Sequence, residues 1–402
     1  MKSAIARNNP CALMSAMLVL LATLAMQPAN ALDWRDRSTE PQDAAAAATR
    51  SDEYAWRLFV ALNWPADLRL RAPDRLARFG AERPVVWETW QSVGDVYMKH
   101  GVDPGPWVIG SRPQLIPPER RFEVFSPKDL PNARHIVGGV MVPFQDSIAS
   151  ARRLTEIRMN RSAFDFIRAH QLYRLQGQIR TLKDGAVVSF PFGAKEVKAK
   201  WRPIRQSEST RYHTTVVTLP DGTKRLFGLT ALHIVSKDLP NWFWATFEHV
   251  DNPSLADGEG WQLPSRDSFA CHNEAADCNR PPTGIGLEGT VWQYYRLRGT
   301  QIRYTNSAGQ PQLLANSELE AGMQPTASCM TCHSRAAIGV AGHEAIRLAI
   351  FATGDDDAST DAVRRRGFFG EPRAQWFGPD AGGQKGPRYR QLDFVWSMLK
   401  AQ

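Results

Sequence analysis

The sequence predicts an α+β protein with an antiparallel, β-rich and sandwich-like body and a helical C-terminal segment. Three observations support this fold class. Short runs rich in β-branched and aromatic residues recur between positions 187 and 297, with turns between them. Apolar residues at helical spacing precede these runs. From residue 301 onward the character changes, because a close cysteine pair and helix-like stretches replace the strand-like runs.

The first 31 residues have the composition of an export signal. Two basic residues and no acidic one precede the apolar stretch Ala12–Met26, and Ala29-Asn30-Ala31 fits the small-x-small cleavage pattern. We therefore expect residues 1–31 to be a cleaved signal peptide and the protein to be periplasmic. An uncleaved anchor is the alternative, but this stretch is shorter than the roughly 20 residues of a membrane span. No later stretch is long and apolar enough to cross a bilayer.

Two helices are expected before the strand-like runs. Over residues 51–62 the apolar spacing is helical, Ser51 is expected to cap the N-terminus, and Pro65 lies beyond the end. Residues 63–150, rich in proline, glycine and tryptophan, are expected to be irregular with a few short strands. Over residues 152–180 apolar side chains again recur at helical intervals, namely Leu154, Ile157, Phe164, Ile167 and Leu172.

The strand-like runs predict an antiparallel sheet in the body of the protein, residues 32–300. They are residues 187–190, 196–201, 214–219, 227–235, 242–250 and 290–297. Turn sequences such as Pro220-Asp221-Gly222 separate them. If residues 236–241 form a hairpin loop, residue 235 pairs with 242 and residue 233 with 244.

The C-terminal segment, residues 301–402, is expected to be helical. A helix is predicted near residues 343–351, and an apolar stretch over residues 392–399 predicts a terminal helix. This segment also contains the sequence motif with the clearest chemistry.

The pattern Cys329-Met330-Thr331-Cys332-His333 is the C-x-x-C-H motif of covalent haem attachment. Two thiols three positions apart can each add to one haem vinyl group, and the adjacent histidine presents a ring nitrogen to iron. A dithiol redox site should instead follow a strand within a βαβ unit, and zinc needs further ligands nearby. The motif therefore predicts one covalent haem c, bound through Cys329 and Cys332, with His333 as an axial iron ligand.

A second cysteine pair, Cys271 and Cys278, encloses six residues. In an oxidising export compartment we expect these two cysteines to form a local disulfide. A metal site that also uses His272 is the alternative.

The sixth iron ligand decides the chemistry, because a methionine suits electron transfer and an open face permits peroxide or oxygen chemistry. Met398 follows the motif at a separation typical of small cytochromes c, but it lies in a predicted helix, where a core methionine is the alternative. The predicted hairpin puts His233 and His249 on opposite sheet faces, so both cannot bind one iron. Weaker candidates are Met323, His213 and His343.

The composition is that of a globular protein with a buried core, since 43% of the 402 residues are hydrophobic and 22% are charged. The formal net charge is +8, with basic residues scattered apart from Arg364–Arg366. No basic stripe interleaved with aromatic residues is present, which excludes nucleic acid as a partner. A basic surface can simply be solvated, or it can attract an acidic redox partner protein.

Several segments together resemble a known group of proteins. They are Leu58–Pro65, Val86–Trp90, Glu196–Trp201, Ala231–Val235, Trp242–His249, Ser328–Ser334 and Phe394–Ser397. In this order they resemble a poorly characterised family of exported bacterial proteins described as cytochrome c-like. The resemblance covers most of the mature chain. It implies a monohaem protein with a large non-cytochrome body, and it implies no known reaction.

Three functions agree with these observations. The leading hypothesis is a periplasmic electron carrier or electron-accepting subunit. The rival is a haem peroxidase or oxidase with an open distal iron site, because a simple carrier does not need the large body that precedes the motif. A haem-based sensor is the third. Whether the protein is an enzyme stays open at this point.

Overall fold

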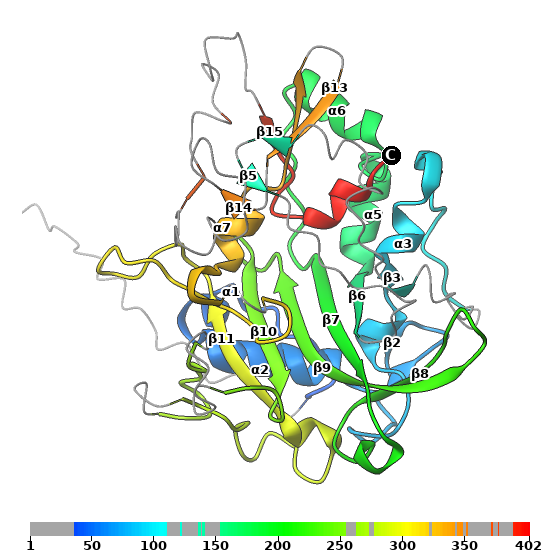
Figure 1. Cartoon of the computed structure of the whole chain (residues 1–402), viewed down its shortest axis with the longest axis vertical. Helices are drawn as coiled ribbons and strands as arrows, with labels where there is room; N and C mark the ends of the chain where they lie inside the picture. Colours follow the sequence, from blue (N-terminus) through cyan, green and yellow to red (C-terminus); the bar gives the residue numbers. More distant parts are fainter. Residues whose placement is uncertain are drawn as a thin grey trace, which may run out of the picture. The chain divides into compact units, whose positions relative to one another are not determined.

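A seven-stranded antiparallel sheet is the largest element of the structure (Figure 1). Its strands follow the order β11-β10-β9-β7-β6-β3, with β8 paired to β9. The bounds are β3 (Gln91–Ser92), β6 (Leu154–Met159), β7 (Lys195–Pro203), β8 (Thr214–Thr218), β9 (Lys224–Ser236), β10 (Phe243–His249) and β11 (Tyr295–Gln301).

The computed structural model describes most of the chain after the predicted signal. The described residues are 36–110, 121–122, 136–137, 139–140, 153–254, 263–272, 277–320, 324–341, 344–348, 351–352, 371–372, 377 and 389–402. All of them belong to one compact unit, Leu32–Gln402. The predicted signal, residues 1–31, and the candidate ligands Met323 and His343 lie outside the described residues.

Helix α2 (Ser51–Leu62) packs its aromatic side chains against one face of the large sheet. The ring of Trp56 lies 5.0 Å from that of Phe247 on β10, and the ring of Phe59 lies 4.4 Å from it. The helix has the predicted bounds, but Ser51 is its first residue rather than its cap. Arg50 occupies the cap position without a side-chain hydrogen bond. Instead of a cap, two acidic residues in the first turn stabilise the N-terminus, because their negative charges interact with the positive end of the helix dipole.

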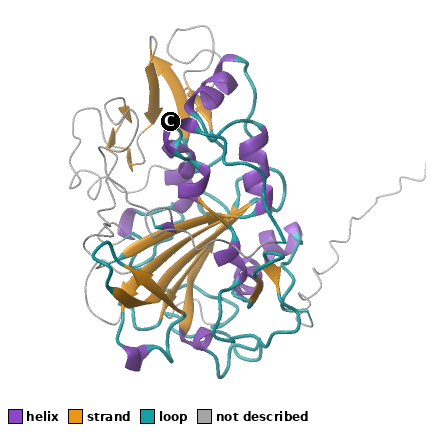
Figure 2. Cartoon of the chain, turned by 90° about the vertical axis from the view of Figure 1, so that its right-hand side faces the viewer, coloured by secondary structure: helices purple, strands orange, loops and turns teal. Residues whose placement is uncertain are grey.

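Along the central strands β9 and β10, successive side chains point to opposite faces of the sheet. In β10, Phe243, Ala245 and Phe247 belong to the core under α2. Trp244, between them, belongs to a second core cluster on the other face. The two cores therefore lie on opposite sides of one sheet. Figure 2 shows this sheet as a single layer with helices beside it, so the predicted sandwich-like arrangement is replaced by helix-on-sheet packing in the described part of the chain.

The second core cluster joins the body to the C-terminal segment. It contains side chains of helix α5 (Arg161–Ala169), of strand β10 and of the last ten described residues, among them Phe164, Trp244 and Met398. Helix α6 (Leu175–Lys183) follows α5, and Gln178 within it donates a hydrogen bond to the carbonyl of Met398 at 2.9 Å. The C-terminal residues are thus part of the core.

The helix predicted over residues 152–180 is wrong in its first part. Residues Leu154–Met159 form strand β6, and Asn160 caps α5 directly after it. Five of the six β6 residues are buried, since β6 lies between two other strands and is covered on both faces. A strand buried on both faces lacks polar alternation, so its apolar spacing cannot be told from that of a buried helix.

A second sheet of four strands replaces the helix predicted near residues 343–351. It has the order β15-β12-β13-β4, in which only the β13–β4 pair is parallel. The bounds are β4 (Ile136–Val137), β12 (Ala337–Ala341), β13 (Glu344–Leu348) and β15 (Tyr389–Gln391). The sequence of β13 is made of good helix formers, and its pairing with β12 overrides that propensity.

The remaining elements are short. The predicted terminal helix is a 3₁₀ helix, η11 (Trp396–Lys400), and residues 187–190 form no strand. The others are α1 (Ala44–Thr49), β1 (Ala66–Asp67), β2 (Ala72–Pro73), η1 (Val86–Thr89), α3 (Val93–Val96), η2 (Lys99–Gly101), β5 (Gly139–Val140), η5 (Gln206–Glu208), η7 (Val291–Tyr294), η8 (Gln324–Thr326), α7 (Cys329–His333) and β14 (Phe351–Ala352). Among the described residues, no helix has the length and apolar character needed to cross a membrane.

The β9–β10 hairpin forms as predicted, but its register differs by two residues. Val235 pairs with Trp244 and His233 pairs with Thr246. A shift of two residues keeps every side chain on its face, because the side-chain period of a strand is two. The prediction that His233 and His249 lie on opposite faces is therefore unaffected.

A disulfide joins Cys271 and Cys278, as the sequence predicts, with a Cα–Cα distance of 6.0 Å. It closes a short loop in a long connection between β10 and β11. Cys278 is buried, and its backbone amide donates a hydrogen bond to the carbonyl of Ser265.

Replacing Cys271 and Cys278 by serine is expected to lower the free energy of unfolding by about 2 to 3 kcal/mol, because the bond restricts the unfolded chain. Denaturant titration of the double variant and the wild-type protein measures the difference. Reduced wild-type protein should match the variant. Equal stability of variant and oxidised wild type would contradict the prediction.

Candidate functional site

The C-x-x-C-H motif folds as the short helix α7, which is fixed to the sheet at its N-terminus. The side chain of Ser328 caps the helix by accepting a hydrogen bond from the amide of Thr331 at 3.3 Å. Gln301, at the end of β11, donates a hydrogen bond to the Ser328 hydroxyl at 2.9 Å and accepts one from the amide of Met330 at 3.2 Å. Because Gln301 is fully buried, this amide group holds the motif at one position on the sheet edge.

The two motif cysteines are free and half-buried. Burial raises the pKa of the Cys332 thiol to about 11, and the nearby carboxylate of Glu320 adds to this effect. The pKa of Cys329 is also raised, for the same reasons. A thiol with a raised pKa is a poor nucleophile at neutral pH, whereas dithiol redox sites depend on a lowered pKa. The surroundings therefore do not favour the dithiol alternative.

The imidazole of His333 has its two nitrogens in different environments. Its Nδ1 lies 2.8 Å from the carbonyl oxygen of Phe394. A carbonyl can only accept, so Nδ1 carries the proton and donates, and Nε2 keeps its lone pair. Burial lowers the pKa of His333 to about 4, so the ring is neutral at neutral pH. A neutral imidazole whose other nitrogen donates to a carbonyl is the usual form of a metal-ligating histidine.

Aromatic side chains enclose the motif. The ring of Trp244 on β10 lies 4.5 Å from that of His333, and the indole nitrogen of Trp396 donates to the carbonyl of Cys332 at 2.9 Å. Met330, between the two cysteines, is fully buried in the same core cluster. The helix is thus held at its C-terminus by residues from both the sheet and the last described segment.

A polar group from the sheet lies beside the motif. His233 on β9 pairs with Lys198 on β7, so the two side chains are neighbours on one face. The Nε2 atom of His233 lies 3.4 Å from a carboxylate oxygen of Glu320. That nitrogen is buried and makes no hydrogen bond of good geometry. His233, Lys198 and Glu320 all affect the pKa of His333 electrostatically, which puts them in its neighbourhood.

The other candidate histidines lie elsewhere. His249 lies on the apolar face of the sheet and stacks on Tyr212 at 3.7 Å. Its Nε2 donates to the carbonyl of Arg211 and its Nδ1 accepts from the amide of Asp251, so both nitrogens are used. His213 pairs with Glu88 in a separate cavity. Of the described histidines proposed as a sixth ligand, His233 is the one beside the motif.

Met398 is fully buried in the second core cluster. The carbonyl of Phe394, four residues earlier, meets Nδ1 of His333. The C-terminal segment therefore approaches the imidazole on the side away from Nε2. This arrangement favours the core-methionine alternative for Met398 over a role as the sixth ligand.

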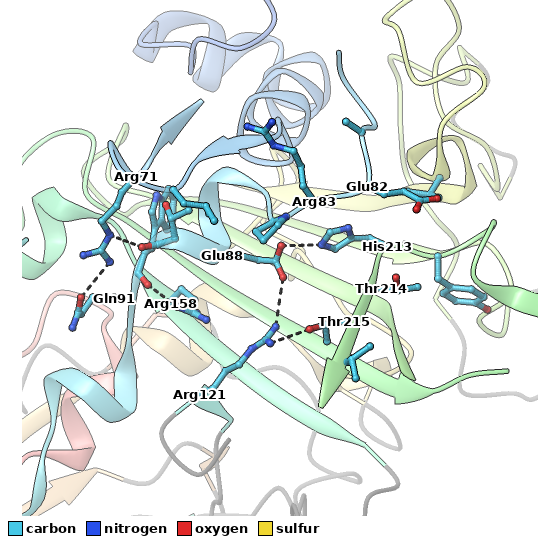
Figure 3. Close-up of a pocket in the computed structure, with 18 of the residues that line it drawn as sticks. Arg71, Glu82, Arg83, Glu88, Gln91, Arg121, Arg158, His213, Thr214 and Thr215 are labelled. Carbon is cyan, nitrogen blue, oxygen red and sulfur yellow. Dashed lines mark hydrogen bonds and ion pairs between the residues drawn. The ribbon is translucent and has the colours of Figure 1, made fainter. Parts of the chain in front are cut away.

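A second site, which the sequence analysis missed, is a cavity of about 1000 Å³ (Figure 3). Its walls come from the loop around β1 and β2, from η1, from β8 and from η7. Charged and polar side chains line it together with aromatic and aliphatic ones. The charged and histidine lining residues are Arg71, Glu82, Arg83, Glu88, Asp95, Arg121, Arg158 and His213.

Glu88 is the centre of the polar network on this cavity. Its carboxylate accepts hydrogen bonds from Nε2 of His213 at 3.0 Å and from the amide of Val85 at 2.9 Å, and it pairs with Arg121. Burial raises the pKa of Glu88, but His213 and Arg121 outweigh burial and lower it to about 2. Glu88 is therefore ionised at neutral pH, and it fixes the orientation of the His213 ring.

Glu156 on β6 connects the cavity to the sheet. It accepts hydrogen bonds from Arg121, from Arg158 and from the indole of Trp201, and it is fully buried. Such a buried carboxylate is tolerated because two guanidinium groups and an N–H donor surround it. The residues of this network come from segments far apart in the sequence, so no local pattern could reveal it. The only local signal was the short apolar run before Glu88.

Comparison of the chain with protein-family models, with curated proteins and with solved structures found no match. In the part of the chain that the structure describes, no group of three or more His, Cys, Asp or Glu side chains is arranged to hold a metal ion. The function is therefore argued from the motif and from the cavity themselves.

The depressed pKa of Glu88 makes a prediction for stability against pH. Because this pKa is about 2 in the folded protein and ordinarily 4.5, Glu88 stabilises the native state above pH 4.5 and loses this contribution as the pH falls toward 2. Unfolding free energies measured across this window should fall less steeply in Glu88→Gln than in wild type. Glu82→Gln, at an exposed carboxylate on the same cavity, should keep the wild-type slope. Parallel curves for Glu88→Gln and wild type would refute this.

Proposed function

We propose that this chain is an exported monohaem c-type cytochrome that transfers electrons. The observation that carries the proposal is the state of the motif. Two free thiols one helical turn apart lie beside a neutral imidazole whose Nδ1 donates to the Phe394 carbonyl, so Nε2 is available to iron. These groups fit a haem c, which Cys329 and Cys332 would hold through thioether bonds while Nε2 of His333 would bind the iron. When bound, the haem supplies one-electron redox chemistry.

The chain's own residues would exclude water from the haem and position it. Gln301 and Ser328 hold the N-terminus of α7, and Trp244 and Trp396 cover the histidine and the second cysteine. Burial of this kind would disfavour the oxidised, more highly charged state of a bound haem and so would adjust its potential. The large sheet would then bury and orient the haem, which would explain why a body of this size precedes the motif.

We propose that His233 would supply a second histidine ligand to the iron of a bound haem. Its buried Nε2 lacks a good hydrogen bond, and it lies on the sheet face beside the motif. Glu320 is within 3.4 Å of that nitrogen and could instead hold His233 as a polar group over an open iron. That second arrangement supports the rival function, a haem peroxidase or oxidase, because such enzymes place polar groups over a vacant position.

Export is part of the proposal. The predicted signal at residues 1–31 and the disulfide between Cys271 and Cys278 both agree with an oxidising compartment such as the periplasm. The redox partner would be a protein, and the net positive charge of this chain favours an acidic one.

Covalent attachment is tested by acid–acetone extraction of the purified protein, which should leave the haem on the chain. Replacing Cys329 and Cys332 by serine should make the haem extractable or absent, because both thioether bonds are lost. The matched control is the Cys271→Ser, Cys278→Ser variant, which should retain covalent haem. Extractable haem in the wild type would refute attachment.

The sixth ligand is tested by the ferric absorption spectrum. We expect a low-spin spectrum without the weak long-wavelength band of methionine ligation. His233→Ala should convert it to high spin, whereas Met398→Leu, which keeps the core volume, should leave it unchanged. A methionine band that disappears in Met398→Leu would assign Met398 instead. A high-spin wild type that turns over peroxide would replace the electron carrier by the enzyme.

A further inference from the structure

We propose that the cavity bounded by η1, β8 and the β1–β2 loop binds a hydroxylated aromatic carboxylic acid (Figure 3). The carboxylate would pair with Arg71, and the hydroxyl group would form a hydrogen bond with Nδ1 of His213. This site is separate from the C-x-x-C-H motif, and the inference does not depend on the haem.

Arg71 forms no ion pair within 4.0 Å in the described part of the chain, and the carboxylate of Asp95 acts on it only from a greater distance. Its guanidinium group donates to the carbonyl of Thr89 at 2.6 Å, to the side chain of Gln91 at 3.2 Å and, weakly, to the carbonyl of Val108 at 3.5 Å. A guanidinium group has five N–H donors, so two remain for a ligand. The guanidinium group also stacks on the indole ring of Trp107, with its central carbon 3.7 Å from the ring centroid, and this contact fixes the plane of the group.

The backbone of Arg71 supports a functional role. Its φ angle is +55°, in the left-handed region that residues other than glycine, asparagine and aspartate rarely adopt. Asp67 holds this turn by accepting hydrogen bonds from the amides of Arg69 and Leu70. A strained residue that aims an unpaired cation at a cavity is a recurrent feature of binding sites.

The other arginines on the cavity are neutralised. Arg121 pairs with Glu156 and Glu88, and Arg158 pairs with Glu156. Arg83 pairs with Asp74 at 2.7 Å. An anion entering the cavity therefore finds its available cation at Arg71, and the planar fork of arginine matches a carboxylate.

His213 supplies the second anchor. Its Nε2 donates to the carboxylate of Glu88, so Nδ1 is the ring nitrogen left for a ligand. The ring lines the cavity. The ring is held flat against Trp292 at 4.9 Å. An oriented ring nitrogen of this kind favours a ligand that carries a hydroxyl group, which can either donate or accept a hydrogen bond.

The walls of the cavity suit an aromatic body. Both anchors depend on the same 3₁₀ helix, because Glu88 holds His213 and the carbonyl of the adjacent Thr89 holds Arg71. Apolar walls accompany them, including Trp90, Trp292 and Leu226. The volume of about 1000 Å³ accommodates ligands of the size of common organic acids.

The test is isothermal titration calorimetry of the full protein with matched ligands. The probes are 4-hydroxybenzoate and the longer 4-hydroxycinnamate. Benzoate lacks the hydroxyl group, and 4-hydroxybenzamide lacks the charge. We expect saturable binding of at least one hydroxy acid. The analogue without the hydroxyl group or without the charge should bind about tenfold more weakly or not at all. Because these comparisons use the wild-type protein, they do not depend on whether any variant folds.

Two variants assign the site. Arg71→Gln should weaken hydroxy-acid binding about tenfold or more, because a charge-assisted hydrogen bond is lost. Arg83→Gln, which removes a paired arginine from the same cavity, should bind like the wild type. Absence of hydroxy-acid binding, equal binding of 4-hydroxybenzamide, or unchanged binding in a folded Arg71→Gln would overturn the proposal. Binding of inorganic phosphate at Arg71 in preference to the hydroxy acids would overturn it as well.

Discussion

The alternation of side chains along β9 and its two neighbours is the constraint on which the rest of the structure depends. Every second residue of these strands packs under α2, in a core of aromatic and aliphatic groups. The residues between them face the other way, and Lys198 and His233 are neighbours there. Because a one-residue shift would exchange the two faces, the register of these pairs decides which histidine lies beside the motif and which is buried in the body.

Much of the fold could be predicted wherever this alternation was visible. Strands β7, β8, β9 and β10 were predicted close to their observed bounds, and so was α2. Strand β6 was missed because it is buried on both faces, and β13 was missed because its helix-forming sequence is overruled by pairing with β12. The hairpin register was wrong by two residues, since the loop has the predicted length of six residues but lies one residue later, at 237–242 instead of 236–241.

The two sites differ in how far sequence could reveal them. The C-x-x-C-H motif is contiguous, so its chemistry can be read without a fold, although its support by Gln301 and Phe394 cannot. The cavity around Glu88 is assembled from residues over a hundred positions apart, and the short apolar run before Glu88 was its one local signal. His213 was considered only as a weak iron ligand, and its partner Glu88 was not considered at all.

The Phe394 carbonyl, which accepts a hydrogen bond from His333, belongs to a turn with a strained backbone. Asp393 and Phe394 have φ angles of +47° and +69°, and the Asp393 carboxylate is clamped by Lys237 at 2.6 Å and by the amide of Phe190 at 2.7 Å. A stronger hydrogen bond at Nδ1 makes an imidazole a better electron donor to a metal. Lys237 and the loop at Phe190, which hold Asp393, can thus influence the electron density at Nε2 of His333, the nitrogen that we propose binds iron, without touching it.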